Sequence, residues 1–338
     1  MIIFAKCSYI PVPLYPLQYP HTHGKGNAMG NTLNRRDFIL RSASLGTSIA
    51  VGGMLQRLAG PAVYAGSGSP DLAVVEAANY YDAARKAVEA LGGMNQFVPK
   101  GSRVGLLVNS VFDKPGTYTK PQIVLAVITM CHEAGAASIT SLEDAHGSYW
   151  RRATLSKEDR ERIDSIRSPG GTVTIDLPHG VKLKSVEILR DLLECDVYIN
   201  MPIFKDHEGT RFTGVLKNIM GTTSSSSNRF FHKGAVLSGY YDDPAFLSQC
   251  IADAHLVRKP TLCVADGTEM IVTNGPSGPG KMAKPRLVVA GTDGVAVDAY
   301  GATILGLRVE DVVMIQKAQE NGIGTADLSK LRITKISI

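Results

Sequence analysis

Side chains able to do chemistry are concentrated between Asn200 and Lys233 of this 338-residue chain. The segment follows an apolar run, Cys195 to Ile199, that is typical of a short buried strand. Open α/β sheets bind ligands beyond the carboxyl ends of their strands, so this segment is where we expect the functional site. Its polar members of interest are Asn200, Lys205, Asp206, His207, Lys217, Asn218, His232 and Lys233.

The Lys205-x-His207 pair is the first catalytic candidate, together with His232. Residues two apart in an extended chain point the same way, so Lys205 and His207 can face one ligand. A neutral imidazole can act as a base or a metal ligand near pH 7, and an adjacent lysine suits an anion. The alternative is a surface lysine beside a solvated histidine.

A second group of residues is predicted to bind substrate. Lys217 and Asn218 follow a glycine-containing turn on a short helix, and helix starts bind anions through their free N–H groups. Asp298 lies in an apolar helical pattern, where a carboxylate is either a buried, paired group or part of a site. The predicted substrate-binding set is Asn200, Lys217, Asn218, Asp266 and Asp298.

A metal ion is an open alternative. His207, His232 and Asp266 are the candidate ligands, and Asp144 or Asp298 would also supply a carboxylate. No HxxxH or HxH spacing supports this set. Beyond residue 65 the cysteines are Cys131, Cys195, Cys250 and Cys263, without CxxC spacing. We therefore interpret them as small buried hydrophobes and expect no self-contained iron–sulfur cluster.

The elements that would position these residues alternate between strand and helix patterns, which predicts an α/β fold with a mostly parallel sheet flanked by helices. Polar residues follow several strands, namely Asn109, Glu143, Asp144, Asn200 and Asp266. Predicted strands cover residues 103–109, 137–142, 172–177, 195–199, 261–265, 286–290 and 331–336. Predicted helices cover residues 69–91, 121–133, 156–164, 185–193, 210–220, 244–257, 294–305 and 310–320.

Two loops are predicted near the site. Ser224 to Ser227 is interpreted as a flexible loop and not as a catalytic nucleophile, because no GxSxG motif surrounds these serines. Residues 267–284 form an 18-residue loop with the core Asn274 to Gly280, which we interpret as a lid.

The first 65 residues are interpreted as an upstream segment plus a twin-arginine signal peptide. Arg35 and Arg36 precede a weakly apolar segment that ends at Ala65, with Val63 and Ala65 fitting a cleavage site. This pattern predicts recognition by the twin-arginine export machinery, a periplasmic or otherwise exported protein, and a single α/β domain over residues 66–338. The alternative is a retained membrane anchor, although Gln56 and Arg57 interrupt the apolar run.

Charge excludes one class of partner. Of 36 Lys+Arg and 31 Asp+Glu, six basic residues and one acid lie before Gly66, so 30 of each sign remain. A neutral domain has no electrostatic footprint for nucleic acid, so none is expected as a partner.

Several blocks in order resemble the domain-of-unknown-function family 362 over about Arg103 to Leu307. They are Asn200-x-Pro202-x-x-Lys205-x-His207, Thr213-Gly214-x-x-Lys217-Asn218-x-x-Gly221, His232, Asp266-Gly267, Asn274-Gly275-Pro276 with Gly278, and Asp293 to Ala299. The resemblance implies an α/β domain, often exported or fused to a ferredoxin-type domain, without a settled activity. The fused domain is not expected here, because no cysteine cluster follows. The first predicted strand ends in Val108-Asn109-Ser110, where the family usually shows Lys-Pro-Asn.

These observations favour an exported enzyme, or a descendant of enzymes, that acts on a small anionic substrate with or without a metal. Lys205 and Lys217 would hold the anion, His207 or His232 would move protons, and Asp266 and Asp298 would orient them or bind a metal. The alternative is a non-catalytic periplasmic accessory protein that holds a ligand, metal or cofactor for a redox partner.

Overall fold

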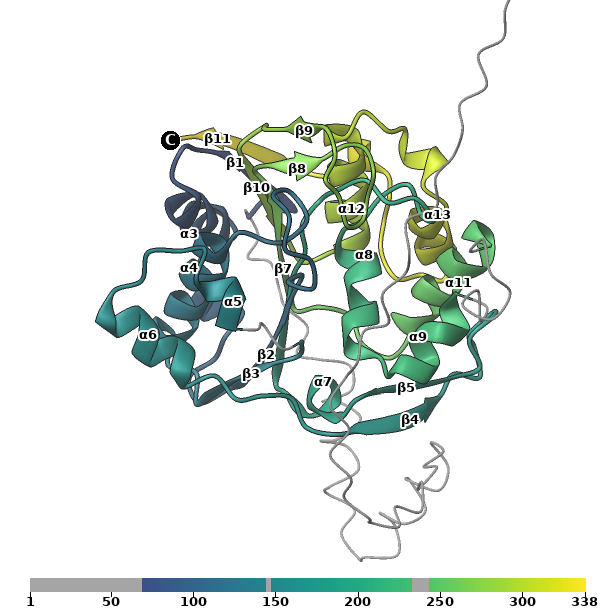
Figure 1. Ribbon diagram of the computed structural model, residues 1–338, viewed down its shortest axis with the longest axis horizontal. Coiled ribbons are helices and arrows are strands. Elements are labelled where there is room, and N and C mark those ends of the chain that lie inside the picture. The colour runs from purple at the N-terminus through teal and green to yellow at the C-terminus, as the bar shows by residue number, and fades with distance from the viewer. Residues whose placement is uncertain (1–68, 144–146, 233–242) are drawn as a thin grey trace, which may run out of the picture. The chain divides into compact units, whose positions relative to one another are not determined.

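The computed structural model describes residues 69–143, 147–232 and 243–338 (Figure 1). Its main sheet has the strand order β11-β1-β10-β7-β6-β2-β3. Within this sheet only β10 runs against its neighbours, so the predicted α/β fold with a mostly parallel sheet is confirmed. The strands are β1 Leu72–Glu76, β2 Arg103–Val108, β3 Ser138–Ser141, β6 Val197–Met201, β7 Leu262–Gly267, β10 Leu287–Gly291 and β11 Ile333–Ser337.

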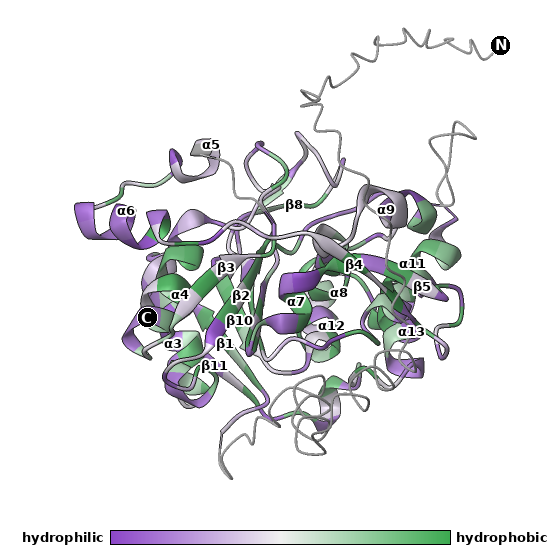
Figure 2. Cartoon of the chain, turned by 90° about the horizontal axis from the view of Figure 1, so that it is seen from below, coloured by the Kyte–Doolittle hydropathy of each residue, from purple (hydrophilic) through white to green (hydrophobic). Residues whose placement is uncertain are grey.

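Helices cover both faces of the sheet, which explains why the central strands are almost continuously apolar. Val104, Leu106 and Val108 of β2 belong to a core shared with α3 (Tyr80–Ala90) and α4 (Pro121–Glu133). Leu107 points to the opposite core. That second core contains side chains of α8 (Val215–Asn218), α11 (Pro244–Ala254), α12 (Gly294–Ile304) and α13 (Val313–Glu320). Figure 2 shows the apolar strands in green and the charged helix α6 in purple.

Smaller elements surround these layers. The short strand pairs are β4 Thr172–Asp176 with β5 Ser185–Leu189, and β8 Met270–Ile271 with β9 Met282–Ala283. The remaining α-helices are α5 Gly147–Trp150, α6 Lys157–Asp164, α7 Arg190–Glu194 and α9 Ser225–Phe231. The 3-10 turns are Met94–Gln96, Ile219–Thr222, Val309–Asp311 and Leu328–Lys330.

The predicted helix over residues 69–91 is wrong in its first part. Leu72 to Glu76 form β1, which pairs with β10 on one side and β11 on the other. The helix begins only after Asn79, whose side chain caps the N–H groups of Tyr81 and Asp82. The apolar residues of β1 are buried on both faces of the sheet, and a short fully apolar run does not distinguish strand from helix by its period.

Four further predictions need correction. Residues 185–193 divide into β5 and α7, because Ser185 to Leu189 pair with β4. The serine run is helical in α9, with Ser224 capping the N–H of Ser227. The predicted loop over residues 267–284 contains two short strands, β8 and β9, which pair with each other. The predicted helix over 210–220 is confined to α8 and the following 3-10 turn.

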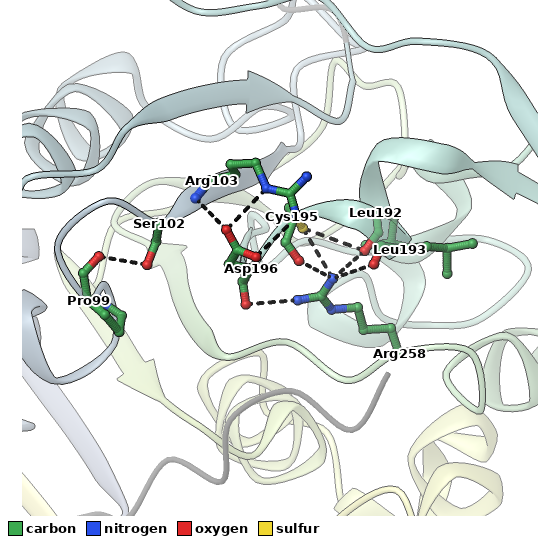
Figure 3. A network of polar contacts seen from close by, with 8 residues as sticks. All are labelled: Pro99, Ser102, Arg103, Leu192, Leu193, Cys195, Asp196 and Arg258. Carbon is green, nitrogen blue, oxygen red and sulfur yellow. Dashed lines mark hydrogen bonds and ion pairs between the residues drawn. The ribbon is translucent and has the colours of Figure 1, made fainter. Parts of the chain in front are cut away.

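Arg258 holds the amino end of β6 in place through hydrogen bonds (Figure 3). This end of the strand lies opposite the edge of the sheet that carries the polar residues. Its guanidinium donates to the carbonyl oxygens of Leu192 and Cys195 at 2.6 and 2.7 Å, and to that of Asp196 at 3.2 Å. Asp196 in turn pairs with Arg103 of β2 at 3.1 Å. These contacts fix where β6 starts, and therefore where its carboxyl end places the residues that follow Asn200.

Residues 1–65, on which the export prediction depends, lie outside the described part of the chain. Among the described helices, none combines the length and apolar character needed to cross a membrane.

Candidate functional site

A cavity of about 340 Å³ opens at the carboxyl ends of β2, β3 and β6. This volume lies within the usual range for sites of small ligands. Because these strands are parallel, the chain segments that leave them meet along one edge of the sheet. The cavity is lined by Asn109, Val111, Phe112, Glu143, Lys205, His207, Thr213, Lys217, Asn218, Met220, Gly221, Asn228, His232 and Pro276.

Lys205 is the most unusual group in this lining, because its side chain is only 1% exposed. The Lys205 Nζ donates to the carbonyl oxygen of Thr117 at 2.6 Å and to Oδ1 of Asn109 at 3.5 Å. The ring of Phe112 lies 4.6 Å from the same nitrogen. Burial, reinforced by the charge of Lys217, lowers the pKa of Lys205 to about 7, against the opposing effect of Glu143.

Glu143 is the acidic counterpart of Lys205 in the cavity. Burial raises the pKa of its carboxyl to about 7, and the positive charge of Lys205 opposes this rise. Its Oε2 lies 2.7 Å from the position that a Cβ on Gly221 would occupy, so the glycine leaves room for the carboxyl. The cavity therefore holds one acid and one base that both change protonation near neutral pH, an arrangement suited to proton transfer.

His207 presents a donor, not a lone pair, to the cavity. Its Nδ1 accepts the backbone N–H groups of Gly209 at 3.0 Å and Thr210 at 3.3 Å. The proton of the neutral ring must therefore be on Nε2. Burial lowers the pKa of His207 to about 2, helped by the charges of Lys217 and Lys205. The ring thus stays neutral, and in this arrangement Nε2–H can donate to an anion.

A chain of side-chain amides supports the cavity from behind. Asn109 Nδ2 donates to Asn218 Oδ1 at 3.1 Å, and Asn218 Nδ2 donates to Asn200 Oδ1 at 2.8 Å. Asn200 Nδ2 then donates to the hydroxyl of Tyr198 at 3.1 Å and to the carbonyl oxygen of Val215 at 3.0 Å. Each amide orients the next, so Asn200 fixes the position of Asn109 and through it the amine of Lys205.

Asp298 anchors α8, which carries Lys217 and Asn218. Its two carboxyl oxygens accept the N–H groups of Val215 at 2.6 Å and Leu216 at 2.8 Å. Burial raises the pKa of Asp298 to about 7, and these two hydrogen bonds oppose the rise. A Cβ on Gly214 would lie 2.1 Å from Asp298 Oδ1, so the close approach requires glycine.

Asp266 has a comparable anchoring position. Its Oδ2 accepts the N–H of Lys120, the residue before α4, at 2.7 Å. Its Oδ1 accepts the N–H and the hydroxyl of Thr268 at 2.8 and 2.6 Å. Burial raises the pKa of this carboxyl. All three donors belong to the chain itself, so this carboxylate connects the end of β7 to the start of α4.

The loop predicted as a lid contributes one wall. Pro276 lines the cavity, and the N–H of Gly275 donates to Asp206 Oδ2 at 2.9 Å. A Cβ on Gly275 would lie 1.7 Å from the carbonyl oxygen of Asp206, so this contact also requires glycine. Asp206, which lies between Lys205 and His207 in the sequence, thus connects this loop to the cavity through a hydrogen bond.

The structure brings together only part of the predicted site. Lys205, His207, Lys217, Asn218 and His232 line the cavity, whereas Asn200, Asp266 and Asp298 lie outside its lining. Asp144 and Lys233 fall outside the described residues. Sequence reasoning noticed Asn109 and Glu143 only as polar residues after strands. Thr213 was named only as part of the family motif, and the sequence contained no signal for Phe112, whose ring lies 4.6 Å from the Lys205 amine.

The three proposed metal ligands are not assembled around one point, since Asp266 is separate from the cavity lining. In the described part of the chain, no group of three or more His, Cys, Asp or Glu side chains is placed to hold a metal ion. Cys131, Cys195, Cys250 and Cys263 are buried, consistent with their interpretation as small hydrophobes.

The structure is an α/β protein with a polar cavity at the carboxyl ends of its strands. Residues 104–303 match the family described as "Domain of unknown function (DUF362)", so the chain belongs to this family. It is similar to the thylakoid-associated protein sll1697 of Synechocystis sp., with 27% identity over 239 residues that cover 69% of this chain and 72% of the relative.

Solved structures give more distant similarities. A Thermotoga maritima protein has a TM-score of 0.37 and 15% identity, covering 71% of this chain. The lactate racemase apoprotein of Thermoanaerobacterium thermosaccharolyticum has a TM-score of 0.38 and 12% identity, covering 70%. The chain spans 58% and 55% of those two proteins, respectively.

Proposed function

We propose that this protein binds a small anion in the cavity and acts on it as an enzyme by proton transfer. The observation that carries the proposal is the pairing of Lys205 with Glu143 in one cavity, each with a pKa of about 7. Lys217 and the Nε2–H of His207 hold the anion, and Glu143 and Lys205 exchange protons with it. A metal ion has no part in this proposal.

Two further observations support a bound ligand. Lys205 and Lys217 line the same cavity, and the charge of Lys217 lowers the pKa of Lys205, an effect that an anion between them would relieve. The hydroxyl of Thr213, which also lines the cavity, is buried with no hydrogen-bond partner among the described residues. Buried polar groups are normally satisfied, so a ligand oxygen is the expected partner.

Calorimetric titration with short carboxylates and inorganic phosphate tests the binding step. Lys217→Gln is expected to weaken binding about tenfold, because one charge-assisted hydrogen bond is lost. Lys157→Gln is the matched control, since that side chain on α6 is 92% exposed. Unchanged affinity in Lys217→Gln, or an equal loss in both variants, would contradict the proposal.

The catalytic step is tested separately through Glu143→Gln, which keeps the shape of the side chain and removes its titration. We expect this variant to bind the anion but to lose solvent-deuterium exchange into it, measured by NMR. Binding without exchange in the wild type would instead favour the second candidate, a non-catalytic ligand-holding accessory protein for a redox partner. The specific observation favouring that candidate is His207, a neutral fixed donor that cannot accept a proton in this arrangement.

We also propose that the chain is exported by the twin-arginine route. Arg35 and Arg36, the apolar segment and the small residues before Gly66 support this proposal. Mass spectrometry of protein from a periplasmic fraction is expected to find a chain beginning at Gly66. An unprocessed chain recovered only from the cytoplasm would contradict it.

A further inference from the structure

We propose that Lys205 is a nucleophile that forms an imine with the carbonyl group of a short oxo acid, whose carboxylate is held by Lys217. This inference rests on the proposed anion site and deepens it by naming the substrate class and the bond that forms. It concerns the amine of Lys205 itself, because buried lysines near a second cation are suited to imine chemistry.

The hydrogen bonds of Lys205 match a neutral amine. A neutral amine has two N–H groups and one lone pair. Thr117 O and Asn109 Oδ1 are two acceptors for those N–H groups, at 2.6 and 3.5 Å. The lone pair is then directed away from both acceptors, and Lys205 is part of the cavity lining. The amide chain behind Asn109 keeps its oxygen, not its NH₂ group, turned toward Lys205.

The surroundings favour the neutral amine before reaction and the charged imine afterwards. Among the residues that the structure describes, Lys205 has no carboxylate within 4.0 Å, so no salt bridge holds a proton on it. Its pKa of about 7 leaves much of the amine unprotonated at neutral pH. The Phe112 ring, 4.6 Å from Nζ, would stabilise the positive charge of a protonated imine through cation–π attraction.

Glu143 completes the proton balance. The Nζ lone pair adds to the carbonyl carbon while the carbonyl π pair moves to oxygen. That oxygen takes the Glu143 proton, and the resulting carboxylate takes one proton from the nitrogen. The hydroxyl of the carbinolamine then takes this proton from Glu143 and leaves as water as the C=N bond forms. The products are a protonated imine, water and the Glu143 carboxylate, so a new ion pair replaces two neutral groups.

Reductive trapping tests the inference on residues 66–338. The protein is incubated at pH 7 with pyruvate and cyanoborohydride, and the labelled lysine is mapped by peptide mass spectrometry. We expect one adduct, on Lys205, formed on the order of a hundredfold faster than on any exposed lysine, because ordinary lysines are almost wholly protonated at this pH. Acetone, which lacks the carboxylate, is expected to label Lys205 much more slowly.

Two variants and one parallel measurement separate the outcomes. Lys205→Arg is expected to abolish the adduct, because a guanidinium stays protonated at pH 7 and is not a nucleophile. Lys217→Gln is expected to weaken both propionate binding and trapping by pyruvate. Propionate binding by the wild type without preferential labelling of Lys205 would overturn the imine and leave the anion site intact. Absence of both binding and labelling would overturn the anion site and the imine together. The wild-type map decides the question even if Lys205→Arg fails to fold.

Discussion

At the scale of single residues, the hydrogen bonds of His207 change the role expected from its sequence context. A histidine beside a lysine suggests a base or a metal ligand, but the two backbone N–H groups on Nδ1 leave the ring as a donor. A fixed neutral imidazole can polarise a substrate oxygen without exchanging a proton with it. The identity of the residue is visible in the sequence, whereas its tautomer is set by a turn that brings Gly209 and Thr210 back to the ring.

This role predicts that His207 does not titrate between pH 5 and 8. ¹⁵N NMR of the imidazole should show one protonated nitrogen, Nε2, throughout this range, because burial and nearby lysines lower its pKa to about 2. His207→Gln, which retains an N–H donor, is expected to bind the anion within about threefold of wild type, and His207→Ala about tenfold more weakly. A titration midpoint near that of an ordinary histidine would contradict the assigned tautomer and role.

The burial of the Lys205 amine is expected to lower the stability of the folded protein. Its folded pKa, about 7, lies below the ordinary value of 10.5. Between these pH values the unfolded chain binds a proton that the folded chain does not, so this group makes stability fall as pH decreases from 10.5 to 7. Lys205→Met should remove that slope and raise the free energy of unfolding at pH 7 by about 2 kcal/mol, after the lost hydrogen bond to Thr117 is counted.

Urea unfolding at pH 7 and pH 9 measures this effect, and Lys157→Met provides the control with a lysine whose side chain is 92% exposed. The stabilisation of Lys205→Met should be smaller at pH 9 than at pH 7. Equal stability of wild type and Lys205→Met at both pH values would show that burial of the Lys205 amine does not lower the free energy of unfolding.

At the scale of elements, local sequence predicted the helices with clear caps and the buried strands of the parallel part of the sheet. Pro121 to Glu133 is helical over the predicted range, and Asp293 caps α12 as its position suggests. The wrong predictions occur where pairing with a distant segment determines the secondary structure. Leu72 to Glu76 become a strand because residues 287–291 and 333–337 lie on either side, and no local pattern contains that information.

The candidate site shows the same limit. The cavity lies at the edge of the sheet formed by the strand ends, but Asp298 and Asp266 lie outside its lining. Their carboxylates accept backbone N–H groups and the Thr268 hydroxyl. A buried carboxylate has the same sequence signature in both roles. Thr213 lies in the site because the chain after β6 turns back along itself, with Lys205 bridged to Thr213. Phe112 comes from the segment after β2, and its ring lies beside the Lys205 amine.

The anchoring of α8 predicts a sharp effect of a single methyl group. Gly214→Ala should destabilise the protein by about 1–3 kcal/mol, because its Cβ would lie 2.1 Å from Asp298 Oδ1 and 2.6 Å from the Phe212 ring. Anion affinity should fall as well, since α8 carries Lys217. Gly171→Ala is the matched control, because a Cβ there meets no atom within 4 Å. Thermal unfolding and calorimetry measure both effects, and equal behaviour of the two variants would refute the anchor.

At the scale of the whole molecule, the folded unit is larger than its family match. Residues 104–303 contain β2, β3, β6, β7 and β10 but lack β1, α3, α13 and β11. Without β1, one edge of β10 loses its partner. Without α3, the apolar side chains of Val288 and Ala290 lose part of their cover, and without α13 the core around α11 is opened.

We therefore expect a fragment of residues 104–303 to be insoluble or to melt without a cooperative transition, although it contains every residue of the cavity lining. Residues 69–338 should unfold in one cooperative step by circular dichroism and calorimetry. A fragment of residues 69–303 contains β1 but lacks β11, so β1 becomes an exposed edge strand. We expect this fragment to be soluble only if the exposed edge does not cause aggregation. A cooperative transition of the 104–303 fragment at the temperature of the 69–338 chain would show instead that β1 and β11 are accessory. The ends of the chain would then contribute to neither the fold nor the geometry around Lys205.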